Sequence, residues 1–163
     1  TVSGLGDVYK RQVTILGNNS AIPAYGRHPT SQIVTTSDDL IMFDCGEGSQ
    51  IQIMNFKIKR SRINHIFISH LHGDHYFGLI GLLSSLALLG RIQPLTVYGP
   101  APLKQIIELQ FQISNTSLPF PFTFHAIEEA GLLLDAKNYT VECFPTQHRI
   151  ECWGFLVLSL IHI

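Results

Sequence analysis

Three histidines and an aspartate lie within six residues of one another in the run 70–75 (HLHGDH). Imidazole nitrogen is a preferred ligand of Zn²⁺, and carboxylate oxygen can add to the coordination. While the chain is extended, His70 and His72 point to the same side, and Gly73 lets the backbone turn so that Asp74 and His75 point elsewhere. One short loop can therefore supply two adjacent metals. Two metals about 3.5–4 Å apart can clamp the attacking and leaving oxygens of a phosphodiester.

The segments around this loop alternate between strand and helix. Short apolar or β-branched runs predict strands, and periodic apolar positions predict helices. Strands are expected at residues 13–16, 32–36, 40–43, 66–69, 95–98, 122–126, 139–144 and 153–157, and helices at 47–56, 76–89 and 101–114. This order predicts an α/β fold with a layered sheet. The loop follows strand 66–69, and the carboxyl end of a strand is where α/β sheets build their sites.

Composition excludes several classes of protein. The chain has 163 residues with 45% hydrophobic and 14% charged, which excludes intrinsic disorder. Its net charge of −1 gives no overall basic field that would announce a nucleic-acid partner. The three cysteines cannot all pair and form no C-x-x-C motif, so a reduced, cytoplasmic setting is expected. No apolar run approaches the length of a membrane span.

The two ends differ in character from the rest of the chain. Residues 1–12 (TVSGLGDVYKRQ) show no periodicity and no cap signal, and residues 158–163 (LSLIHI) form an abrupt apolar tail. Both resemble translated sequencing-library adapter. We therefore expect 1–12 and 158–163 to be non-native tails that flank a partial domain at 13–157.

The histidine loop and its surroundings resemble the metallo-β-lactamase fold, and most closely the ribonuclease Z family of tRNA 3′ endonucleases. The resemblance is carried by PAYGRHPTS (23–31), FDCGEG (43–48), ISHLHGDHYFGLIGLL (68–83) and LTVYGP (95–100). It implies an αββα sandwich that is incomplete here, with roughly the first half and the strand before the third metal motif. It also implies a cytoplasmic zinc-dependent hydrolase that removes 3′ trailers from tRNA precursors, and a homodimer when full length.

The resemblance further implies five metal ligands: His70, His72, Asp74, His75 and His148. His70 and His72 would bind the first of two Zn²⁺ together with His148, which follows strand 139–144. Asp74 and His75 would bind the second. Asp74 would also be the catalytic proton acceptor for a water that zinc activates. Asp44 would orient a ligand histidine through a hydrogen bond. An aspartate at a strand end could equally cap the helix expected at 47–56.

Two departures from the family pattern affect these assignments. Tyr25 and His28 stand where the family's substrate loop commonly has lysine and asparagine, while Arg27 remains as a candidate substrate contact. No aspartate follows His148 to bridge two metals, and the last histidine, His162, lies in the suspect tail. We therefore expect the second zinc site to be incomplete and this chain alone to be weakly metallated and inactive.

Other interpretations stay open at this point. One is another hydrolase on the same fold, such as a small-molecule phosphodiesterase, an arylsulfatase or a thioester hydrolase. A second is a non-catalytic metal or redox module, although di-iron proteins of this fold usually have glutamate where His72 stands. A third is a partial reading frame without function. The basic run at 57–62 holds four cations in six residues and fits either tRNA phosphate contact or a solvated helix end.

Overall fold

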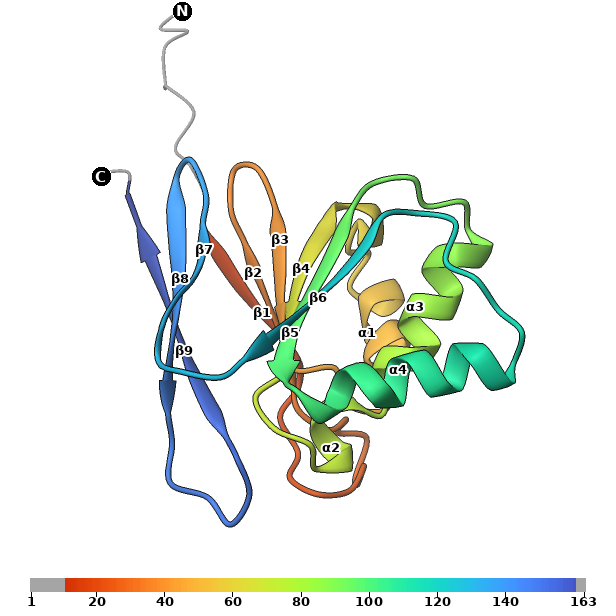
Figure 1. Cartoon of the computed structure of the whole chain (residues 1–163), viewed down its shortest axis with the longest axis horizontal. Helices are drawn as coiled ribbons and strands as arrows, with labels where there is room; N and C mark the ends of the chain where they lie inside the picture. The colour runs from red at the N-terminus through yellow and green to blue at the C-terminus, as the bar shows by residue number, and fades with distance from the viewer. Residues whose placement is uncertain (1–10, 161–163) are drawn as a thin grey trace, which may run out of the picture.

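The computed structural model describes residues 11–160, which form nine strands, four α-helices and one 3₁₀ helix (Figure 1). In chain order they are β1 (Gln12–Gly17), β2 (Ser31–Thr35), β3 (Leu40–Phe43), α1 (Ser49–Asn55), η1 (Arg60–Arg62), β4 (Ile63–Phe67), α2 (Gly73–Tyr76), α3 (Leu79–Leu88), β5 (Leu95–Pro100), α4 (Pro102–Ile113), β6 (Phe122–Ile127), β7 (Gly131–Asp135), β8 (Tyr139–Pro145) and β9 (Trp153–Ser159). Within residues 11–160, no helix is long and apolar enough to cross a membrane.

Strands β1 to β6 form one sheet in the order of the sequence. The β1–β2 and β2–β3 pairs are antiparallel, and the pairs from β3 to β6 are parallel. The central parallel strands are apolar because both faces of this sheet are covered. Helices α1, α3 and α4 cover one face (Figure 1). The buried side of α3 consists of Leu79, Leu82, Leu83 and Leu86.

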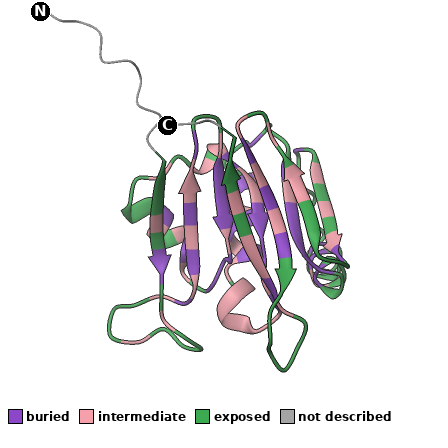
Figure 2. Cartoon of the chain, turned by 90° about the vertical axis from the view of Figure 1, so that its left-hand side faces the viewer, coloured by how far each residue is buried: buried purple, intermediate pink, exposed green. Residues whose placement is uncertain are grey.

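Strands β7, β8 and β9 form a second, antiparallel sheet that packs against the other face of the first. Aromatic rings fill the space between the sheets: Phe67 stacks on Tyr98 at 4.3 Å, and Phe155 of β9 lies 5.5 Å from Phe43. In Figure 2, which looks onto the second sheet, buried residues are interspersed with exposed ones along the strands. The described residues place no helix on the outer face of this sheet (Figure 1). The chain thus has one helix layer and two sheets of the predicted αββα sandwich, which confirms the incomplete fold.

Several boundaries differ from the prediction. The helix expected at 76–89 begins only at Leu79, as α3, and Tyr76 ends the separate short helix α2, which was not predicted. Between the two helices lies Gly78, where a Cβ atom would lie 2.2 Å from the Gly46 carbonyl oxygen. The helix expected at 47–56 begins only at Ser49, since Gly48 has φ 81°. The strand expected at 66–69 begins earlier and ends earlier, as β4.

The sequence pattern does not predict β7. Its run Leu132-Leu133-Leu134 has no alternation between apolar and polar positions, so periodicity cannot separate a strand from a helix there. β7 pairs with β8, and this pairing completes the second sheet.

The ends of the described chain lie in strands. Gln12 opens β1, and Leu158 and Ser159 pair with Thr140 and Tyr139 of β8. These residues fall in the segments expected to be non-native, whereas residues 1–10 and 161–163 lie outside the described part of the chain. The non-native origin of both ends stays a prediction.

Candidate metal centre

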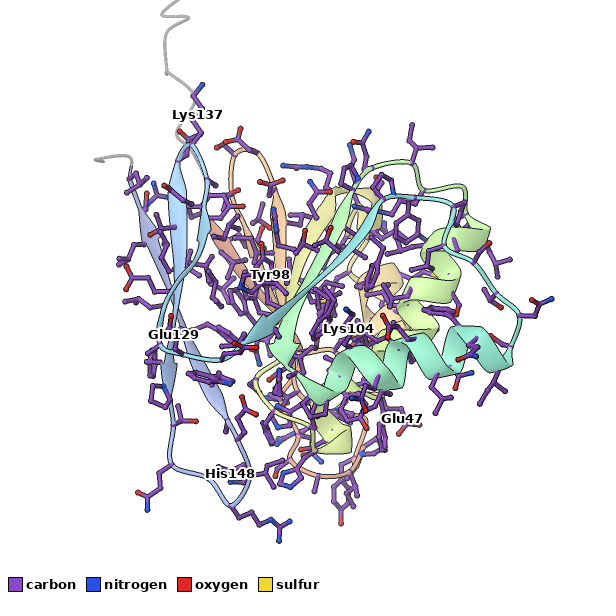
Figure 3. The ribbon with its side chains drawn as sticks, in the orientation of Figure 1. Glu47, Tyr98, Lys104, Glu129, Lys137 and His148 are labelled. Carbon is purple, nitrogen blue, oxygen red and sulfur yellow. The ribbon has the colours of Figure 1, made fainter. Side chains whose placement is uncertain are left out.

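The predicted metal ligands meet at one edge of the first sheet. Strands β3 and β4 are parallel, so Asp44 after β3 and the loop after β4 leave the sheet at the same edge. The β8–β9 hairpin brings residues 146–152 to this edge, where the Trp153 N–H donates to the Ser69 carbonyl over 2.9 Å. Figure 3 shows His148 at the end of this hairpin, at the end of the molecule that carries α2.

Three imidazoles form the centre of the site. Nδ1 of His72 lies 3.1 Å from Nε2 of His70 and 3.1 Å from Nε2 of His148. One nitrogen from each ring lies within 4.8 Å of the others. A tetrahedral zinc ion with Zn–N bonds of about 2.0–2.1 Å separates its ligand atoms by about 3.3 Å. Spacing and donor chemistry therefore both fit a zinc ion held by these three nitrogens.

Ser69 determines which nitrogen of His70 is free. The Ser69 hydroxyl donates its single proton to the Asp44 carboxylate over 2.9 Å, because an ionised carboxylate only accepts. His70 Nδ1, 3.0 Å from the same hydroxyl oxygen, must then be the donor in that pair. This assignment leaves the lone pair of His70 Nε2 directed at the other two histidines. A histidine fixed in this way is the usual arrangement beside a bound metal.

Asp44 supports the loop at three points. Its Oδ1 accepts the Ser69 N–H over 2.8 Å, and its Oδ2 accepts the Ser69 hydroxyl and Nδ1 of His75, the latter at 2.6 Å. The residue is buried and has φ 55°, a left-handed conformation that aspartate tolerates better than most residues. Gly48 precedes α1 without a side-chain cap hydrogen bond. The alternative that Asp44 caps this helix is therefore wrong, and Asp44 orients His75 instead.

Asp74 and His75 form a second group beside the three histidines. Oδ2 of Asp74 lies 3.5 Å from Nε2 of His75 and accepts the Ala21 N–H over 2.8 Å. Since Nδ1 of His75 faces Asp44, Nε2 is the ring nitrogen that is directed at Asp74. The rings of His70 and His75 are 3.9 Å apart between centroids. The loop therefore presents two neighbouring donor sets, as its spacing predicts, and the second contains these two residues.

The protonation states of His70 and Asp74 suit metal binding, whereas Asp44 and Asp74 favour the protonated form of His75, whose proton a metal ion would have to displace. Burial, and after it the neighbouring His75, lowers the pKa of His70 to about 4, so the ring is neutral at pH 7. Burial alone would lower the pKa of His75, but the hydrogen bond and charge of Asp44, with Asp74, raise it overall. Burial opposes ionisation of Asp74, yet the Ala21 N–H and the charge of His75 lower its pKa. Asp74 is thus a carboxylate at neutral pH.

A cleft of about 850 Å³ opens over both donor sets. The loop 70–75, the hairpin residues 146–149 and the segment 20–23 line it, together with Glu47 and Cys152. Arg149 is the one lysine or arginine among the described residues that line this cleft. Arg27 is exposed and lines a different, smaller hollow beside β1.

Sequence reasoning missed three contributors to the site: Ser69, Ala21 and Arg149. Ser69 directly precedes the first histidine, and its place at a strand end beside Asp44 was a usable signal. The Ala21 contact joins residues 53 positions apart through a backbone N–H, and no side-chain pattern encodes such a bond. Arg149 follows His148 directly, so the position of the third motif could have drawn attention to it.

Comparison with known proteins agrees with this geometry. The sequence model of the family described as anti-Pycsar protein Apyc1 matches residues 11–160. Ribonuclease Z of Bacteroides fragilis is 42% identical over 149 residues, which cover 90% of this chain and 49% of that protein. The short form of human tRNase Z superposes with a TM-score of 0.83 and 35% identity over 91% of this chain and 64% of that one.

The fold assignment has independent support. YhfI of Bacillus subtilis, a metallo-β-lactamase fold protein, superposes with a TM-score of 0.69 at 22% identity over 89% of this chain and 56% of that one, a likeness of fold alone. The chain spans about half the length of the curated relatives it matches. The resemblance to ribonuclease Z predicted from the sequence is confirmed. The chain therefore belongs to the anti-Pycsar protein Apyc1 family, has the metallo-β-lactamase fold and is a relative of ribonuclease Z.

Proposed function

We propose that the whole protein to which this chain belongs is a zinc-dependent endoribonuclease that removes 3′ trailers from tRNA precursors. The observation that carries the proposal is the cluster of three imidazole nitrogens beside Asp74 and His75, in a cleft of about 850 Å³. The names of the ribonuclease Z and tRNase Z relatives support RNA as the substrate class. Because this chain spans about half the length of the ribonuclease Z relatives, the proposal concerns the whole protein.

His70, His72 and His148 would hold the first zinc, and Asp74 with His75 would contribute to the second. When bound, zinc supplies a water of lowered pKa as the nucleophile for phosphodiester hydrolysis. Ser69 hydrogen-bonds Nδ1 of His70 and Asp44 hydrogen-bonds Nδ1 of His75, so Nε2 of each ring is the nitrogen directed at the proposed metal sites. Asp74, a carboxylate at neutral pH, is suited to accept the proton that the attacking water loses.

Arg149 is the residue we place nearest the substrate phosphate. A phosphodiester is anionic, and the guanidinium group matches phosphate geometry better than any other side chain. Arg149 lines the cleft next to His148, whereas Arg27 lies outside it. Contact of Arg27 with a more distant part of the RNA stays part of the proposal.

The test compares two substrates on the zinc-loaded whole protein. One is a precursor tRNA with a 3′ trailer, and the other is bis(p-nitrophenyl) phosphate, a small phosphodiester. We expect release of an intact trailer and a tRNA with a 3′ hydroxyl, loss of this activity in Asp74→Asn, and none from the 163-residue chain alone. Hydrolysis of the small ester without any cleavage of precursor tRNA would support the small-molecule phosphodiesterase alternative instead.

We also propose a cytoplasmic, homodimeric whole protein. Three free cysteines, two of them buried, support a reducing compartment. Light scattering of the whole protein tests the dimer, and a monomer at micromolar concentration would exclude it. We keep the proposal that residues 1–12 and 158–163 are non-native; a natural reading frame continuing through either end would exclude it there.

A further inference from the structure

A second concave surface lies at the opposite edge of the first sheet from the metal centre. We call it the basic groove: a hollow of about 920 Å³ where α1 ends, β4 begins and α3 ends. Five of the chain's 11 lysines and arginines line it: Lys57, Lys59, Arg60, Arg62 and Arg91. No acidic residue is among the described residues that line it. The whole chain has a net charge of −1, so this cluster of positive charges is a local feature of the surface.

Arg91 anchors the base of the basic groove. Its guanidinium is buried and donates to the Ser61 and Pro94 carbonyls and to Oδ1 of Asn64. The same group lies 5.5 Å from the centre of the Phe120 ring. These contacts fix η1 and the start of β4. The cations between residues 57 and 62 are thus mounted on a rigid base.

The lysines of the groove are free to meet a ligand. Lys57 and Lys59 are exposed, and neither takes part in an ion pair within the described residues. The lysine pair that is described joins Lys104 of α4 to Glu108 at 3.9 Å, elsewhere on the surface. Unpaired cations held close together repel one another, and a bound polyanion relieves that repulsion.

We propose that the basic groove binds the phosphate backbone of RNA at a distance from the cleft that cuts it. The groove lies at the start of β4 and the metal loop follows its end, so the five residues of β4 separate them by about 17 Å along the strand. An RNA helix longer than this can contact both. The choice of RNA as the polyanion rests on the proposed function; the affinity for phosphate does not.

The experiment measures the binding of fluorescein-labelled precursor tRNA to the whole protein by fluorescence anisotropy at several salt concentrations. EDTA is present so that no metal-dependent cleavage occurs. The groove variant is Lys57→Gln with Lys59→Gln. The matched control is Lys104→Gln with Lys137→Gln, which removes the same charge from two sites labelled in Figure 3. Each phosphate contact contributes about 0.7–0.9 to the slope of log affinity against log salt, so the groove variant should lower the slope by about 1.5 and the affinity about tenfold at 0.1 M salt.

Equal losses in the groove variant and the control, or no loss in either, would overturn the proposal. So would a groove variant that keeps RNA affinity but loses binding to phosphatidylserine vesicles, which would identify a lipid surface. Melting temperatures within about 2 °C of the parent establish that both variants fold. If the whole protein cleaves trailers and the groove variant has an unchanged KM, the groove proposal is rejected and the proposed function is kept. If the protein binds RNA in a salt-dependent way but does not cleave it, the proposed function is rejected and the groove proposal is kept.

Discussion

The two loops that build the candidate metal centre differ in how firmly they are held. The loop after β4 is buried at His70 and fixed by Asp44 and Ser69, and the His75 carbonyl accepts the Cys45 N–H over 2.7 Å. The β8–β9 hairpin that carries His148 is exposed from residue 144 to residue 151. Its hydrogen bonds include those from Thr146 to the Cys152 carbonyl and from the Trp153 N–H to the Ser69 carbonyl. The loop side of the site is preorganised by buried hydrogen bonds, whereas the hairpin side is exposed and contacts the loop near its end.

The largest effect is expected on the firm side, from Asp44→Ala. This change leaves the Ser69 N–H and His75 without their buried acceptor, so the free energy of unfolding should fall by about 3 kcal/mol. Zinc affinity should fall about 10–100-fold, as for other groups that orient metal ligands. Urea unfolding and zinc titration measure the two. Asp135→Ala, at an exposed aspartate of β7, should change unfolding by less than about 0.5 kcal/mol.

The second test substitutes a proposed zinc ligand on each side of the site. Both His70→Ala and His148→Ala should weaken the first zinc at least about 100-fold, since a ligand matters more than its supporting hydrogen bonds. In EDTA, without bound metal, the two variants should differ in their free energy of unfolding. His148→Ala should unfold like the parent, whereas His70→Ala should lose about 1–2 kcal/mol because its ring is buried. Equal losses of stability in EDTA would mean that the hairpin is as firmly built as the loop.

A third test concerns the close contact that divides α2 from α3. Gly78→Ala places a Cβ 2.2 Å from the Gly46 carbonyl and 2.9 Å from the Cys45 carbonyl, both backbone atoms, and should cost about 2–3 kcal/mol. Gly81→Ala is the control within α3, because its Cβ would meet only the flexible end of Gln50 at 3.2 Å. That change should be neutral or stabilise by up to about 1 kcal/mol through helix propensity. A similar loss of melting temperature in both variants would contradict this account.

The smallest effect is on the pH dependence of stability, and it concerns the side of the site that carries Asp44. Burial raises the pKa of Cys45 to about 12. Stability from this thiol is complete below pH 9 and declines as pH rises toward 12, because the unfolded chain loses the proton first; the slope is about 1.4 kcal/mol per pH unit. Cys45→Ala should reduce the alkaline loss measured by urea unfolding at pH 8 and pH 10. A slope unchanged by the substitution would show that other groups cause the loss.

The same comparison can be made with a thiol reagent. Cys152 lines the cleft and is partly exposed, whereas Cys45 and Cys143 are buried. We expect one rapid equivalent of Ellman's reagent per folded chain at pH 8, absent in Cys152→Ser.

Much of this molecule could be predicted from local patterns. The loop 70–75 and the parallel strands follow from spacing and apolar runs, and they lie where α/β sheets build sites, whereas the role of Asp44 was implied by the family resemblance. His148 was assigned by family resemblance, because no spacing links it to residues 76 positions away. The division at Gly78 and the Ala21 contact depend on backbone approaches between distant segments. Such approaches leave no period in the sequence, so they became visible only in three dimensions.

The distance between the two loops along the chain also has a meaning in time. His72 and His148 are 76 residues apart, and a ribosome adds about 5–20 residues per second, so the last imidazole is made about 4 to 15 seconds after the first. By the end of that interval every strand of the first sheet and every hydrogen-bond partner of Asp44 has been made, since all of them come from residues 12–127. If the three histidines bind zinc as proposed, the nascent protein carries an open half-site, and capture of the metal by all three waits for the final hairpin.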